Sequence, residues 1–168
     1  NEIYLFGRRR GSGESIWEIK RHIGLVSSEF HSRYHHHVTV QDAVASGFFD
    51  SVGRYRRLTP PQREQITVWL ERFELNHLRA RPLATLSYGQ QRLVLIARAM
   101  VKKPTLLILD EPCQGLDPVQ RSRVITAIDQ IGRSQSAQII YVSHHADQIP
   151  ACITRHLELT LAGRPVVR

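Results

Sequence analysis

The sequence predicts an α/β fold in which helices cover a parallel β-sheet. Its second half alternates between helical and strand patterns, which is typical of units whose successive strands lie parallel. The predicted elements there are a helix over 87–100, a strand over 105–109, a helix over 118–131 and a strand over 138–142. At 168 residues with 42% hydrophobic content, the chain is long enough for one domain around a single core.

Capping and breaking residues place the ends of these helices. Ser87 and Asp117 stand where N-caps are expected, Pro118 suits a first helical turn, and Gly132 ends the helix that begins there. Beyond the last of these strands, the pattern predicts a short helix near Asp147 and two edge strands over 157–161 and 165–167.

The first half of the chain predicts short elements followed by a mostly helical region. The elements are an opening strand over 2–7, a turn over 8–13, a helix capped by Ser15, a buried strand over 23–27, a helix over 40–49 capped by Thr39, and a helix that begins at Pro60. We therefore expect a helical unit over 30–84 and an α/β unit over 85–168.

The net charge of +8 comes mainly from arginine. Two short arginine-rich stretches lie at 8–10 and 54–57. Such a charge suits nucleic acid, acidic lipid headgroups or a triphosphate. Aromatic residues are not interleaved with the arginines, as a surface that stacks bases would require, so the charge does not by itself favour nucleic-acid binding.

The chain has only two cysteines, Cys113 and Cys152, too few and too far apart for a disulfide framework. No apolar run approaches the roughly 20 residues that span a bilayer, and the first residues form neither a signal nor a transit peptide. A reducing cytosol is the simplest compartment, with any membrane association made through a partner. Because the chain begins inside a strand pattern without Met, we expect it to be a fragment of a longer protein.

Two carboxylates, Asp110 and Glu111, stand directly at the end of the hydrophobic strand predicted over 105–109. The carboxyl edge of a parallel sheet is where α/β proteins bind ligands. An aspartate there suits Mg²⁺, and an adjacent glutamate can orient or deprotonate an attacking water. An ordinary helix cap or surface turn is the alternative for this pair when it is taken alone.

Ser87, Gly89 and Gln90 open a helix, where free backbone N–H groups and the helix dipole favour an anion. His144 follows a second buried strand, that over 138–142, so it would stand at the same sheet edge and could donate a hydrogen bond to a terminal phosphate. No phosphate loop of the G-x-x-x-x-G-K-S/T type occurs in the chain. The glycine-rich stretch over 11–15 lacks the lysine and is read as a turn.

The order LSYGQQR, LLILDEP, GLD and SHH resembles the nucleotide-binding domain of ABC-type ATPases over nearly the whole chain. The resemblance implies a P-loop NTPase-like sheet with an inserted helical subdomain over 30–84. It implies that 86–90 is the signature motif, in which Ser87, Gly89 and Gln90 contact a nucleotide. Asp110 would end the Walker B strand, and Glu111 would be the catalytic carboxylate. Asp117 would belong to the D-loop, and His144 would be the switch histidine.

Three departures qualify the resemblance. Ser28 stands where the family has the metal-contacting glutamine of the Q-loop, so Ser28 would have to take over that metal contact. Tyr88 replaces the first glycine of the signature. The Walker A loop is missing, and it would lie just before residue 1.

The resemblance implies an ATP-binding subunit of an ABC importer that uses ATP and Mg²⁺. Its partners would be a second ABC ATPase domain, packed head to tail, and a transmembrane permease, which places it on the cytoplasmic face of the membrane. The segment over 6–28 is similar to the second half of duplicated ABC ATPases linked with molybdenum transport. This fragment alone is expected to be inactive. The alternative is a soluble ABC ATPase without a permease, acting in DNA repair or translation and binding nucleic acid.

Overall fold

The computed structural model describes residues 2–9, 11, 13, 15–27, 37–50, 57–159 and 165–167. Ser28, the predicted metal-contacting residue, lies outside these described residues, as does most of the second arginine-rich stretch over 54–57. Within the described residues, no helix is both long and apolar enough to cross a membrane.

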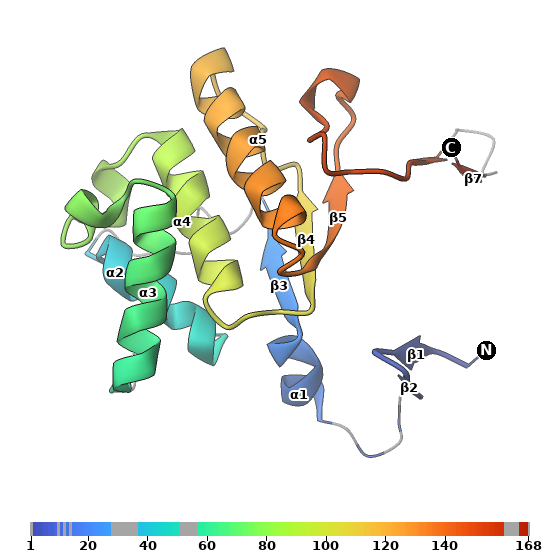
Figure 1. Ribbon diagram of the computed structural model, residues 1–168, viewed down its shortest axis with the longest axis horizontal. Coiled ribbons are helices and arrows are strands. Elements are labelled where there is room, and N and C mark those ends of the chain that lie inside the picture. Colours follow the sequence, from blue (N-terminus) through green and yellow to red (C-terminus); the bar gives the residue numbers. More distant parts are fainter. Residues whose placement is uncertain are drawn as a thin grey trace.

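A parallel sheet forms the centre of the molecule. Its strands are β3 (Ile23–Val26), β4 (Leu106–Asp110) and β5 (Gln138–Val142), with β4 in the middle. Leu107 of β4 pairs with Gly24 on one side and Ile139 on the other. The predicted parallel sheet is therefore confirmed, and all three strands direct their carboxyl ends to one edge (Figure 1).

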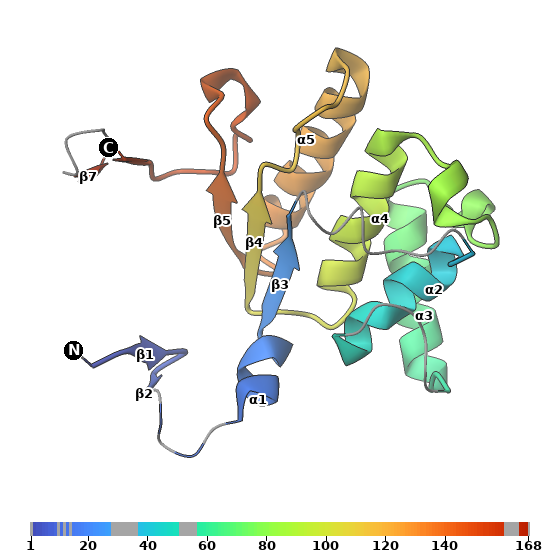
Figure 2. The same ribbon diagram turned by 180° about the vertical axis from the view of Figure 1, so that it is seen from behind.

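Two long helices cover one face of this sheet, α4 (Tyr88–Met100) and α5 (Pro118–Arg133) (Figures 1 and 2). Ile96 of α4 and Ile128 of α5 are fully buried with Leu107 and Leu109 of β4, so the core lies between these layers. Helix α5 continues one residue past Gly132, which was predicted to end it. Gly132 instead packs against Cys152, and an added Cβ would lie 2.5 Å from the Cβ of Cys152.

The opposite face of the sheet is partly exposed in the described residues. Leu25, Ile140 and Val142 expose 41%, 49% and 45% of their surface. The prediction that β5 is a buried strand is wrong for its alternate residues, because the helices among the described residues cover only the other face (Figure 2). A continuous apolar run fits burial on both faces, and sequence alone does not reveal which face is covered.

The helical unit packs against α4. Its described elements are α2 (Val40–Ala45), the 3₁₀ turn η2 (Ser46–Phe49), α3 (Pro60–Arg72) and the 3₁₀ turns η3 (Asn76–Leu78) and η4 (Leu83–Thr85). The helix predicted over 40–49 is thus an α-helix that tightens into a 3₁₀ turn. At the junction with α4, the buried Arg98 donates from Nε to Ser46 Oγ at 3.0 Å. The outer limits of this unit, 30 and 84, stay a prediction.

Short elements lie at both ends of the chain. The opening segment forms a hairpin of β1 (Tyr4–Leu5) and β2 (Arg8–Arg9), followed by α1 (Ile16–Arg21). The prediction of one strand over 2–7 followed by a turn is therefore wrong, because Phe6 and Gly7 adopt positive φ and reverse the chain. The last strands, β6 (Leu157–Leu159) and β7 (Pro165–Val167), form an antiparallel pair separate from the central sheet. The short helix expected near Asp147 is the 3₁₀ turn η5 (Ala146–Gln148).

Candidate functional site

The carboxyl edge of the sheet holds the two predicted carboxylates. Asp110 is the last residue of β4 and is exposed, and it lies opposite Val142 of β5. Glu111 has a φ of 48°, a left-handed conformation that non-glycine residues rarely adopt. Its backbone N–H donates to the Val142 carbonyl at 3.0 Å. Backbone strain of this kind gathers at functional sites, where surrounding contacts maintain it.

Glu111 and His144 are in direct contact. Glu111 Oε1 lies 2.6 Å from His144 Nδ1 and accepts a hydrogen bond from the His144 backbone N–H at 3.1 Å. The Glu111 side chain is only 15% exposed, whereas that of His144 is 68% exposed. The sequence predicted both residues at this edge, and the structure brings them together.

This contact restricts the chemistry of the imidazole. When Glu111 is ionised it can only accept, so Nδ1 carries the shared proton. Nε2 of His144 then donates to a phosphate only if the ring is imidazolium, and otherwise offers a lone pair. The Glu111 carboxylate therefore sets which nitrogen of His144 is protonated.

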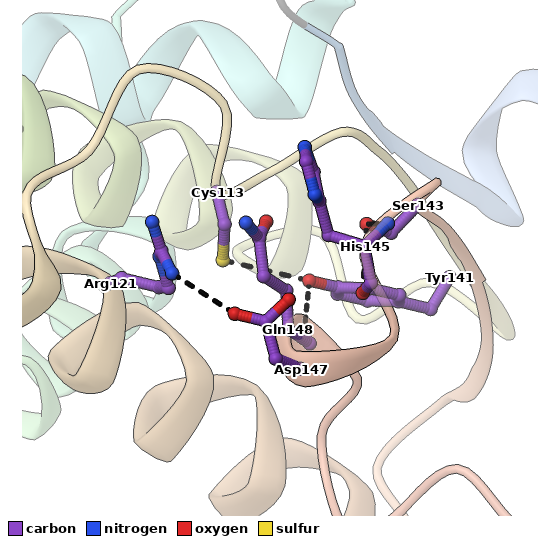
Figure 3. Close-up of polar contacts among 7 residues, drawn as sticks. All are labelled: Cys113, Arg121, Tyr141, Ser143, His145, Asp147 and Gln148. Atoms are coloured by element: carbon purple, nitrogen blue, oxygen red, sulfur yellow. Dashed lines mark hydrogen bonds and ion pairs between the residues drawn. The ribbon is translucent and has the colours of Figure 1, made fainter.

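The loop that carries His144 is closed by side-chain hydrogen bonds (Figure 3). Tyr141, on β5, donates from its hydroxyl to the Gln148 carbonyl at 2.7 Å, which ties the two ends of the loop together. Inside the loop, Ser143 Oγ accepts from the His145 backbone N–H at 3.1 Å. No sequence pattern indicates this closure, because an apolar strand such as β5 favours tyrosine for packing alone.

The same loop is connected to α5. Arg121, in the first turn of α5, pairs with Asp147 at 3.2 Å (Figure 3). Behind the loop the Tyr141 hydroxyl also lies 3.5 Å from Cys113 Sγ. Burial raises the pKa of the Cys113 thiol and raises the pKa of Tyr141 far above its usual value, so both groups stay protonated at neutral pH. Sequence reasoning missed Arg121, Tyr141 and Asp147 as parts of the site.

The predicted helix start at Ser87 is confirmed. Ser87 Oγ accepts from the Gln90 N–H at 3.3 Å, and Gln90 Oε1 accepts from the Ser87 N–H at 3.1 Å, which is a capping box. The Gly89 N–H donates to Gln120 Oε1 at 2.9 Å. The expectation that these N–H groups are free is therefore wrong for Gly89 and Gln90, since side chains already bind both. Tyr88 exposes 69% of its surface and has no positive φ, so it replaces glycine without backbone strain.

Asp117 has a structural role as the N-cap of α5. Its Oδ1 accepts from the Gln120 backbone N–H at 2.9 Å. This bond fixes the first turn of α5, from which Gln120 and Arg121 reach their partners. A nucleotide contact by Asp117 stays a prediction.

The carboxylate side chains at the sheet edge suit a Mg²⁺ ion whose coordination is completed by phosphate oxygens and water. No group of three or more His, Cys, Asp or Glu residues that could hold a metal occurs among the described residues. Mg²⁺ commonly uses one or two carboxylates, with phosphate oxygens and water completing its coordination. The exposed carboxylate of Asp110 suits that role, while Ser28 lies outside the described residues.

Comparisons with known proteins identify the family of this chain. The family model described as ABC transporter matches residues 2–114, and the chain belongs to this family. It is 49% identical to the ABC transporter ATP-binding protein ModF of Escherichia coli (strain K12), over 97% of this chain and 34% of that protein. It is 32% identical to the zinc uptake system ATP-binding protein ZurA of Listeria monocytogenes, over 84% of this chain and 54% of that protein.

Solved structures confirm the predicted fold class. The chain resembles cbiO1 from Clostridium perfringens, part of the ABC transporter complex cbiONQ, with a TM-score of 0.70 and 28% identity over 83% of this chain and 54% of that chain. The ADP conformation of MJ1267, an ATP-binding cassette, gives a TM-score of 0.74 at 19% identity over 92% of this chain and 63% of that chain. The fold is thus the P-loop NTPase-like fold of ABC cassettes. The chain spans between about a third and a half of the length of the two curated relatives.

Proposed function

We propose that this chain is part of an ATP-hydrolysing subunit of an ABC transporter that couples ATP turnover to solute import. The observation that carries the proposal is the contact between Glu111 and His144 at the carboxyl edge of the sheet. A glutamate held in a strained backbone conformation, and bonded to an exposed histidine, suits the activation of a water next to a phosphate.

Each residue at this edge has a distinct part in the proposed reaction. The Glu111 carboxylate orients the attacking water and takes its proton as the water oxygen bonds to the γ-phosphorus and the bond to the ADP oxygen breaks. The imidazole of His144, held through Nδ1, presents Nε2 to the terminal phosphate. Asp110 would hold Mg²⁺, which neutralises charge on the phosphates when it is bound with ATP.

The signature turn serves a different nucleotide in this proposal. By the family resemblance, Ser87, Gly89, Gln90 and Asp117 face ATP held by a second ABC domain packed head to tail, whereas the sheet edge serves ATP held by a phosphate loop outside the described residues. The helical unit would contact a transmembrane permease, placing the protein on the cytoplasmic face of the membrane.

For the solute we propose molybdenum, as molybdate. The support is the higher identity to ModF, 49%, than to the zinc uptake protein, 32%. Uptake of molybdate and of zinc by cells with and without the complete gene tests this proposal. Loss of molybdate uptake alone supports it, and loss of zinc uptake alone contradicts it.

ATP hydrolysis is tested on the complete protein with Glu111→Gln. The amide keeps an acceptor for the His144 N–H but cannot take a proton, so we expect turnover to fall about 100-fold or more. Glu71→Gln, at an exposed glutamate of α3, is the matched control and should leave turnover within about twofold. Unchanged turnover in Glu111→Gln would rule out the catalytic role.

Calorimetry with Mg-ATP tests whether ATP binding requires a phosphate loop upstream of this chain. We expect the 168-residue chain alone to bind no Mg-ATP, and a version extended upstream to bind it. Binding by the chain alone would mean that its own residues form the phosphate site, and the stretch over 11–15 would be the first candidate. Salt-sensitive binding of duplex DNA by the complete protein would instead favour the soluble ABC ATPase.

A further inference from the structure

The first turn of α4 is already bonded to the first turn of α5. The Gly89 N–H, one of the N–H groups left without a partner inside the helix, donates to Gln120 Oε1 at 2.9 Å. The next N–H along, that of Gln90, donates to Ser87 Oγ. The Ser87 bond is a local cap within one helix, but the Gln120 bond crosses between two helices and was not expected from the sequence.

Gln120 also fills the space that the missing side chain of Gly89 leaves. A Cβ built on Gly89 would lie 2.8 Å from the Cβ of Gln120, 2.9 Å from its Cγ and 3.0 Å from its Oε1. Gly89 is buried, and its φ is not in the left-handed region. Glycine is therefore needed here for the close approach of Gln120, in addition to any approach of a phosphate.

From this geometry we propose that the carboxamide of Gln120 is a built-in competitor of the nucleotide phosphate at the signature turn. The inference rests on the proposed function, in which this turn meets the phosphate of a partner-bound ATP. One N–H cannot donate a full hydrogen bond to Gln120 and to a phosphate oxygen at the same time. Phosphate binding at Gly89 therefore requires the Gln120 carboxamide to leave.

The chemistry of Gln120 suits a partner that can be displaced. A neutral amide oxygen accepts a weaker hydrogen bond than a charged phosphate oxygen, so the phosphate prevails once it is present. The helix that carries Gln120 keeps its other anchors, because Asp117 caps the turn and Arg121 pairs with Asp147. Release of one side chain therefore leaves the first turn of α5 in place.

The competition has a predicted size and sign. A net hydrogen bond of this type weakens phosphate binding about fivefold, because the bond must be broken first. In the complete protein, Gln120→Leu and Gln120→Met remove the acceptor but keep the side-chain bulk. We expect both variants to lower the KM for ATP about fivefold while kcat changes less than KM. Gln120→Glu, which adds a negative charge beside the phosphate, should raise the KM.

A matched control separates this effect from a general change of α5. Gln130→Leu makes the same replacement on the same helix, ten residues further on, and should leave the KM unchanged. A merely stabilising role for Gln120 predicts a lower melting temperature together with an unchanged or higher KM in Gln120→Leu. Competition predicts a lower KM even where the melting temperature falls. An unchanged or higher KM in the variants that fold overturns the inference, and Gln120→Met decides if Gln120→Leu does not fold.

The proposed function and the competition fail in different ways. If the complete wild-type protein hydrolyses no ATP, or if Ser87→Ala leaves the KM and kcat unchanged, the proposed role of the signature turn fails. If Ser87→Ala impairs turnover but neither Gln120→Leu nor Gln120→Met lowers the KM, only the competitor role of Gln120 is overturned.

Discussion

Replacing Tyr141 with phenylalanine tests how the loop carrying His144 is held. The hydroxyl of Tyr141 donates to the carbonyl of Gln148, whose residue is only 6% exposed. Tyr141→Phe keeps the ring and its packing but leaves that carbonyl without its donor. The variant therefore isolates one hydrogen bond between the two ends of the loop.

The expected cost follows from burial. Leaving a buried acceptor unsatisfied costs about 1–3 kcal/mol, and a loss of about 2 kcal/mol lowers the melting temperature of a chain of this size by about 4–8 °C. Because burial keeps the pKa of Tyr141 far above neutral, its hydroxyl stays protonated, and the loss should be the same from pH 6 to pH 9. In the complete protein, kcat should fall about tenfold with an unchanged KM for ATP, because His144 loses its position.

Urea and thermal denaturation measure the stability loss, and steady-state ATP hydrolysis measures the effect on kcat. Tyr4→Phe is the matched control, since the hydroxyl of Tyr4 makes an exposed bond to Glu2 and its loss should cost less than about 0.5 kcal/mol. If Tyr141→Phe is as stable as the wild type and turns over ATP normally, the closure of the loop by Tyr141 has no energetic or functional value.

Three further predictions concern other contacts of the fold. Gly47→Ala should cost about 3 kcal/mol in urea denaturation, because its Cβ would lie 2.0 Å from the Arg98 carbonyl oxygen, and a cost below about 1 kcal/mol would refute this packing. Burial raises the pKa of Cys152 to about 11. At pH 9 the alkylation of this thiol should therefore be about 50-fold slower in the native state than in urea. Equal alkylation rates in the two states would contradict the raised pKa. For the same reason Cys152 should reduce stability as the pH rises above about 9, where the unfolded thiol ionises first. Asp147→Asn should change stability by less than about 0.5 kcal/mol, since 69% of the Asp147 side chain is exposed. The same variant should lower kcat about threefold. A normal kcat would show that the ion pair of Asp147 with Arg121 does not position the loop.

The parts of the fold that depend on local sequence could be predicted. Ser15, Ser87 and Asp117 each accept a hydrogen bond from a backbone N–H of the first turn of their own helix. The capping residue and the N–H that it binds therefore lie within four residues of each other in the sequence. The central strands follow from hydrophobic runs between helices. The pairing of Glu111 with His144 was predictable in outline, because parallel strands bring their carboxyl ends to one edge.

The contacts between elements could not be predicted. Gln120 meets Gly89 across 31 residues, and nothing in the sequence near either residue indicates the other. Tyr141 reads as a strand residue, although its hydroxyl closes a loop. These contacts depend on how α5 lies against α4 and β5, which is set by the packing of the whole core and not by any short pattern.

That packing gives the first turn of α5 two contacts at once. Successive residues of a helix point about 100° apart, so the neighbours Gln120 and Arg121 reach different elements. Gln120 bonds to the start of α4, and Arg121 pairs with the loop that carries His144. Asp117 fixes the turn from which both extend. Loss of the Gln120 contact alone leaves the turn in place, because Arg121 still anchors it, but loss of both contacts leaves only the Asp117 cap. The double variant Gln120→Leu with Asp147→Asn should therefore show effects on ATP turnover that do not add. Strict additivity would mean that the two contacts act independently.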